Sequence, residues 1–98
     1  MKKKELTVII PTFNRSNSLI LILQSLSHQS IKEYKINVII CDSYSKDGSE
    51  KNVKFFSENN QYLNIKYLNI DANILSAKRN YGIKNSSTKF NILIDDDC

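Results

Sequence analysis

The chain has 98 residues, enough for one hydrophobic core and too few for two domains. Its formal net charge of +4 comes largely from Lys2, Lys3 and Lys4, so the rest of the chain is nearly balanced. The other charges are scattered, whereas a nucleic-acid binder usually gathers Lys and Arg on one face with aromatic residues between them. No apolar run reaches the roughly 18 residues that a transmembrane helix needs. We therefore expect a single cytoplasmic domain over residues 1–98. We interpret the basic N-terminal segment as solvated. The alternative is that it contacts the inner face of an anionic membrane peripherally.

Segments typical of strands recur along the sequence. Continuous apolar runs predict strands over residues 6–10, 36–41 and 89–94, and an alternating run predicts a half-exposed strand over residues 64–68. Continuous apolar runs are typical of strands that are buried on both faces of a parallel sheet. Pro11 is expected to end the first strand.

Helical patterns fill the gaps between these strands. Ser16 or Asn17 can cap the first helix, Asp47 with Glu50 resembles a capping box for the second, and Asn73 can cap the third. The residues expected to face inward are Leu19, Leu23 and Leu26 in the first helix, Val53 and Phe56 in the second, and Ile74, Ala77 and Tyr81 in the third. The order β-α-β-α-β-α-β predicts a Rossmann-like α/β fold with three α/β/α layers and a mainly parallel sheet.

Polar and charged residues follow the predicted strands, at the edge where parallel α/β sheets bind ligands. Asp42 follows the second strand, and the triplet Asp95-Asp96-Asp97 follows the fourth. Clustered carboxylates repel one another unless they are solvated or hold a cation, and hard divalent ions bridge carboxylates to phosphates. Arg15 or Arg79 could then add charge-assisted hydrogen bonds to a diphosphate. A solvated acidic turn is the alternative for the triplet.

Five blocks of sequence together resemble the family 2 inverting glycosyltransferases of the GT-A fold. The blocks are residues 8–15 (VIIPTFNR), 23–26 (LQSL) with Gln29, 42–49 (DSYSKDGS), 77–83 (AKRNYGI) and 94–97 (IDDD). The resemblance covers nearly the whole chain and corresponds to the N-terminal, nucleotide-sugar-binding portion of such an enzyme. Ser43 and Tyr44 stand where the family usually has a second Asp and a Gly, which leaves the shape of the ribose side of the pocket open.

The resemblance implies a nucleoside-diphosphate sugar as donor, commonly a UDP-sugar, and Mn²⁺ or Mg²⁺ as cofactor. The residues it assigns to the nucleotide sugar are Pro11, Thr12, Asn14, Arg15, Asp42, Arg79, Asp95 and Asp96. Within this set, the Asp42 carboxylate is expected to accept a hydrogen bond from the base. Asp97 is expected to bind the metal ion together with Asp95.

The implied reaction transfers a sugar to an acceptor hydroxyl with inversion, as in polysaccharide biosynthesis, with a glycan or lipid-linked saccharide as acceptor. The resemblance places the general base downstream of Cys98, so we expect no catalytic residue or acceptor-binding part in this chain and no turnover by it alone. Two other classes stay open. One is a non-catalytic nucleotide-binding or interaction module. The other is the donor half of a nucleotidyltransferase, which would need a glycine-rich loop that residues 11–17 lack. The exposed sheet edge is expected to allow self-association, which sedimentation would reveal.

Overall fold

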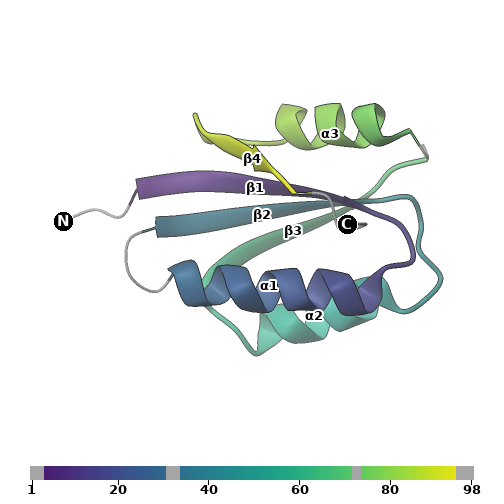
Figure 1. Ribbon diagram of the computed structural model, residues 1–98, viewed down its shortest axis with the longest axis horizontal. Coiled ribbons are helices and arrows are strands. Elements are labelled where there is room, and N and C mark those ends of the chain that lie inside the picture. The colour runs from purple at the N-terminus through teal and green to yellow at the C-terminus, as the bar shows by residue number, and fades with distance from the viewer. Residues whose placement is uncertain (1–3, 31–33, 72–73, 95–98) are drawn as a thin grey trace.

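Residues 4–30, 34–71 and 74–94, which the computed structural model describes, form four parallel strands and three helices (Figure 1). In chain order the elements are β1 Lys4–Thr12, α1 Ser16–Ser30, β2 Tyr34–Asp42, α2 Ser49–Glu58, β3 Leu63–Asn69, α3 Leu75–Lys84 and β4 Asn91–Leu93. Helices α1 and α2 lie on one face of the sheet and α3 lies on the other (Figure 1). The predicted three-layer α/β/α arrangement is confirmed.

The strand order in the sheet is β3-β2-β1-β4, and every pairing is parallel. The chain adds β2 and β3 on one side of β1 and then crosses to place β4 on the other side. The carboxyl ends of β1 and β4 therefore flank the topological switch point, where sheets of this kind bind ligands. β1 and β2 pair along their whole length, from Lys4 opposite Tyr34 to Thr12 opposite Asp42, so their exits are level.

The main core lies between the sheet and the α1–α2 layer. Alternate residues of β1 and β2, such as Val8 and Ile40, pack there against Leu19, Leu23 and Val53. Burial of each such side chain contributes about 1.5–3 kcal/mol. Leu26 and Phe56 pack against this core while staying partly exposed. The expected inward-facing residues of the first two helices are thus confirmed.

β1 continues through Pro11 to Thr12, so the expected strand end at Pro11 is wrong. The Thr7 N–H donates to the Phe90 carbonyl, and the Ile9 carbonyl accepts from the Ile94 N–H. By the alternation of strand residues, Pro11 turns its backbone toward the same side. It lies past the described β1–β4 ladder, so its missing N–H breaks no ladder bond there.

β4 is shorter and more exposed than its apolar sequence predicts. It covers only Asn91–Leu93, and Phe90, Ile92 and Leu93 are 67%, 47% and 44% exposed. The described helices pack over β1, β2 and β3, so β4 lies at an uncovered edge of the sheet. An apolar run therefore did not indicate burial on both faces here. β3 lies at the opposite edge, as its alternating pattern predicts.

α3 approaches the sheet through a different set of residues from the predicted stripe. Its buried residues are Lys78 and Gly82, whereas Ile74 occupies the N-cap position and is largely exposed. The expected cap, Asn73, lies outside the described residues. Tyr81 does pack against a second, smaller cluster formed by Ile9, Ile39 and Cys41. Gly82 lets the helix backbone come close to β1 and β2, and this close approach decides which face is inward.

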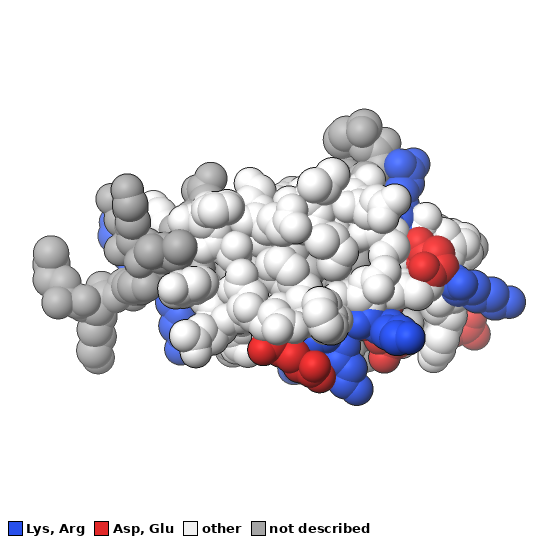
Figure 2. All heavy atoms as spheres, turned by 90° about the horizontal axis from the view of Figure 1, so that it is seen from below, with Lys and Arg blue, Asp and Glu red and all other residues white. Residues whose placement is uncertain are grey.

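The α1–α2 face carries few charges over much of its area (Figure 2). The sequence of α1 contains no Asp, Glu, Lys or Arg, and the charged residues of α2 include Glu50, Lys51 and Lys54. None of the described helices has both the length and the apolar character that crossing a bilayer requires.

Candidate functional site

The turn after β1 and the loop after β2 are joined by hydrogen bonds. The Asn14 N–H donates to Ser45 Oγ at 2.7 Å, and the Lys46 N–H donates to Asn14 Oδ1 at 2.8 Å. Asn14 has a left-handed backbone with φ 52°, which asparagine tolerates better than most residues. The sequence separates these segments by about thirty residues, and the fold fixes them as one unit at the carboxyl edge of the sheet.

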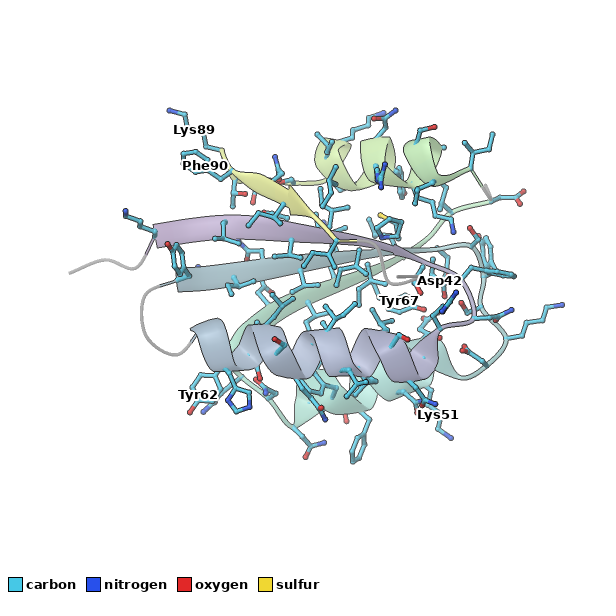
Figure 3. All side chains as sticks on the ribbon, viewed as in Figure 1. Asp42, Lys51, Tyr62, Tyr67, Lys89 and Phe90 are labelled. Atoms are coloured by element: carbon cyan, nitrogen blue, oxygen red, sulfur yellow. The ribbon has the colours of Figure 1, made fainter. Side chains whose placement is uncertain are left out.

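Asp42 lies beneath this loop, with only 1% of its surface exposed. Its carboxylate accepts hydrogen bonds from Ser45 Oγ at 2.5 Å, from the Ser45 N–H at 3.2 Å, and from the Tyr67 hydroxyl. Figure 3 shows Asp42 and Tyr67 pointing toward one another at the carboxyl ends of their strands. Burial, and then the hydrogen bond to Asp42, raise the pKa of Tyr67, so its hydroxyl stays protonated and donates. Asp42 thus anchors the loop and, through Ser45, the Asn14 turn.

The Asp47 carboxylate accepts hydrogen bonds from the first residues of both α1 and α2. Its Oδ2 accepts from the Ser16 N–H at 2.9 Å, and its Oδ1 accepts from the Ser49 N–H at 3.1 Å and from Ser49 Oγ at 2.5 Å. The predicted capping box with Glu50 is wrong, because the N-cap position of α2 is Gly48 and Glu50 Oε1 accepts from Asn69 Nδ2 instead. The bonds from Ser49 and Ser16 outweigh desolvation and lower the pKa of Asp47.

Asp47→Asn tests this arrangement through its pH dependence. Because the folded-state pKa is lowered from 3.8, the ionised carboxylate stabilises the fold above that value, and this contribution is lost as the pH falls through the folded pKa. We expect the melting temperature of wild type to exceed that of Asp47→Asn at about pH 6, and this difference to disappear by about pH 2.5. Thermal unfolding followed by circular dichroism at both pH values measures this difference in melting temperature. A gap that persists in acid would contradict the role of the charge.

An open hollow of about 350 Å³ adjoins the β1 exit and the first turns of α1 and α2. Its lining residues are mostly polar: Asn14, Arg15, Ser16, Asn17, Ser18, Asp47 and Asn52. A larger hollow of about 430 Å³ lies between α1 and α2, around Phe55 and Phe56, and is not at the strand exits. We give the first hollow more weight despite its smaller size, because it contains two of the predicted site residues, Asn14 and Arg15.

On the other face of the sheet, Lys78 of α3 reaches the end of β1. It is 5% exposed, and its Nζ donates to the Thr12 carbonyl at 3.0 Å and lies 5.9 Å from the centroid of the Phe13 ring. Burial raises the pKa of the neighbouring Cys41 thiol to about 11, and the positive charge of Lys78 opposes that shift. Cys41 is therefore a buried, protonated thiol at neutral pH. Arg79, the predicted residue, is partly buried beside Lys78.

The structure brings most of the predicted residues to one edge but buries several of them. Asn14 and Arg15 are exposed there, whereas Pro11, Thr12 and Asp42 are buried. Asp95, Asp96 and Asp97 lie outside the described residues. Ile94, the last residue described before the triplet, donates its N–H to the Ile9 carbonyl at 3.0 Å. Among residues 4–30, 34–71 and 74–94, no three Asp, Glu, His or Cys residues gather into a possible metal site.

Two residues of this edge were not assigned from the sequence. Tyr67 lies opposite Ile40 in the β2–β3 register, one step before the pair formed by Cys41 and Leu68. Ser45 is placed by its bonds to Asp42 and Asn14. Only the strand register and the loop path reveal these roles. An aromatic residue in an alternating strand carries no signal of its own.

Comparison with known proteins agrees with the fold. A model of glycosyl transferase family 2 matches residues 7–98. The poly(ribitol-phosphate) β-N-acetylglucosaminyltransferase TarP of Staphylococcus aureus is 29% identical over 94 residues, which are 96% of this chain and 28% of TarP. The mannosyltransferase PcManGT of Pyrobaculum calidifontis, solved with GDP-Man and Mn²⁺, superimposes with a TM-score of 0.81 at 19% identity, over 98% of this chain and 28% of PcManGT.

The S. aureus TarS fragment 1–349, solved with UDP, superimposes with a TM-score of 0.76 at 25% identity, over 95% of this chain and 27% of that one. The chain thus spans less than a third of the length of each of these three proteins. Since the family model matches nearly every residue and the fold agrees, this chain, with its Rossmann-like GT-A fold, belongs to glycosyl transferase family 2.

Proposed function

We propose that this chain forms the donor site of a metal-dependent, inverting glycosyltransferase whose donor is a nucleoside-diphosphate sugar, most simply a UDP-sugar. The observation that carries the proposal is the joined edge at the switch point. There the Asn14 turn is held to the Asp42–Ser45 loop, and the chain after β4 lies beside β1 as far as Ile94, whose N–H donates to the Ile9 carbonyl. PcManGT with GDP-Man and Mn²⁺, and TarS with UDP, give independent support for this class of ligand.

Among the described residues, some are proposed to contact the nucleotide and others to shape the edge around it. Asn14 and Arg15 are exposed and are proposed to touch the nucleotide, Arg15 through charge-assisted bonds to phosphate oxygens. Pro11 and Thr12 are buried and are proposed to shape the edge. Arg79 is proposed to add positive charge from α3.

Asp42 is proposed to accept a hydrogen bond from the base. Both of its oxygens already accept bonds from Ser45 or Tyr67, so a base must reach a remaining lone pair of this buried carboxylate. That approach requires the loop of residues 43–48 to move outward. Binding of the base would then alter the hydrogen bonds that Ser45 and Tyr67 donate to Asp42.

A divalent ion suits the donor set of the triplet, because Mn²⁺ and Mg²⁺ prefer carboxylate oxygens. Asp97 and Asp95 are proposed to hold it, with Asp96 beside them and contacting the donor. The bound ion would neutralise the diphosphate leaving group. The general base, and the part that binds an acceptor glycan or lipid-linked saccharide, are proposed to lie in residues outside this chain.

Calorimetric titration with UDP and GDP, with and without Mn²⁺ or Mg²⁺, tests the proposal. We expect binding that the metal strengthens, and Asp97→Ala should remove this metal dependence, weakening binding by about tenfold or more in the presence of the metal. Glu58→Ala, at the end of α2 remote from the strand exits, is the control and should bind as wild type does. Absence of nucleotide binding under every condition, or unchanged metal dependence in Asp97→Ala, would overturn the donor site.

A further inference from the structure

We propose that Lys78 binds the diphosphate of the nucleotide at the β1–β4 switch point. The inference rests on the proposed donor site and assigns one of its phosphate ligands to a residue of α3. Lys78 and the exposed Arg15 then flank the end of β1, Lys78 from the α3 side of the sheet.

The first argument is the state of the Lys78 side chain. Among the described residues it is the one cationic side chain that is buried. An ammonium group has three N–H donors, and the described part of the chain supplies one acceptor, the Thr12 carbonyl at 3.0 Å. A buried cation without a carboxylate or phosphate partner is costly, because desolvation is not compensated. The position therefore favours an anion as a further partner.

The second argument is the place of the ammonium group. Thr12 is the last residue of β1, and its carbonyl also accepts from the Ser43 N–H at 3.4 Å. β4 runs beside β1 to the Ile9–Leu93 pair and continues into the triplet. The nitrogen therefore lies at the end of β1, where the Asn14 turn begins and where the Ser43 N–H ties the loop after β2 to the Thr12 carbonyl. The Phe13 ring, 5.9 Å away, supports the cation from another side without neutralising it.

Two kinds of anion are candidate partners for Lys78: the diphosphate, and the carboxylates of Asp95–Asp97, which follow β4 in the sequence. We commit to the diphosphate because the proposed function uses those carboxylates as metal ligands. A diphosphate held by a divalent ion keeps phosphate oxygens available for a second cation. Lys78 supplies this second cation as a point charge.

The matched pair Lys78→Met and Lys84→Met tests the inference. Both lysines lie on α3, but Lys84 is exposed in the last turn, so its loss should change UDP affinity less than about twofold. Lys78→Met should weaken UDP binding by about 10- to 100-fold, as expected for a lost charge-assisted bond. Uridine, which has no phosphate, should bind both variants and wild type equally. Melting curves confirm that each variant is folded.

Two further measurements separate the alternatives. In a background with Asp95→Asn, Asp96→Asn and Asp97→Asn, titrated without metal, Lys78→Met should still weaken UDP binding; loss of the effect there would show that Lys78 only pairs with the triplet. In wild type, the NMR signal of the Lys78 ammonium should shift on addition of UDP and not of uridine. If wild type binds UDP but Lys78→Met binds it equally and the signal stays unchanged, the inference is overturned and the donor site stands. If wild type binds no nucleotide, both are overturned.

Discussion

Gly82→Val is expected to lower the free energy of unfolding by about 3 kcal/mol, because there is no room for a side chain at this position. A Cβ added at Gly82 would overlap Cγ2 of Ile9 and lie 3.3 Å from the Cys41 sulfur. Both neighbours belong to strands at the centre of the sheet, so they cannot move aside without disturbing β1 or β2. Urea unfolding followed by circular dichroism measures the loss.

Asn80→Val is the matched control for this substitution. Asn80 lies on the exposed side of α3, and Asn and Val have similar helix propensities, so the change should stay within about 0.5 kcal/mol. A double-mutant cycle sharpens the test. Gly82→Ala should destabilise wild type but not Ile9→Ala, because Ile9→Ala removes the atoms that the new methyl group would meet. Additive effects in that cycle would show that α3 does not pack on Ile9 in this way.

Asp42→Ala is expected to cost about 2–4 kcal/mol, because it removes a buried carboxylate and leaves the partly buried Tyr67 hydroxyl and Ser45 N–H without their acceptor. The loss should also free the loop after β2 and, through Ser45, the Asn14 turn. Unfolding by urea gives the first effect. The amide exchange rates of Asn14 and Lys46, which should rise, give the second.

Tyr67→Phe separates the two proposed roles of Asp42. Removing the hydroxyl should lower the free energy of unfolding by only about 1 kcal/mol, since Ser45 still donates hydrogen bonds to the Asp42 carboxylate. Tyr34→Phe, at the opposite end of β2, provides the control for loss of a partly buried tyrosine hydroxyl. If Asp42 accepts a hydrogen bond from the base, Tyr67→Phe should keep or improve UDP affinity because it frees a lone pair. A large loss of affinity would instead assign the Tyr67 hydroxyl itself to the binding site.

The sequence by itself determined the order of elements, the parallel sheet and the sheet edge to which the candidate site was assigned. Apolar runs such as residues 36–41 and stripes such as Leu19 and Leu23 reflect burial, and burial follows directly from side-chain chemistry. Chain order and strand polarity then bring the exits to one edge, so Asn14 and Asp42 could be assigned to it without coordinates.

Only the tertiary structure decided which side chains are buried, which are exposed and which partners they contact. Ile74 looked like an inward residue and is exposed, while the charged Lys78 is buried, because Gly82 sets how α3 meets the sheet. β4 looked like a covered strand and lies at an open edge, since a run of residues cannot encode which neighbours cover it. Asp42 looked exposed to a ligand and is enclosed by Ser45 and Tyr67. Such contacts join residues distant in the sequence, and a pattern within one segment contains no information about its partner in another.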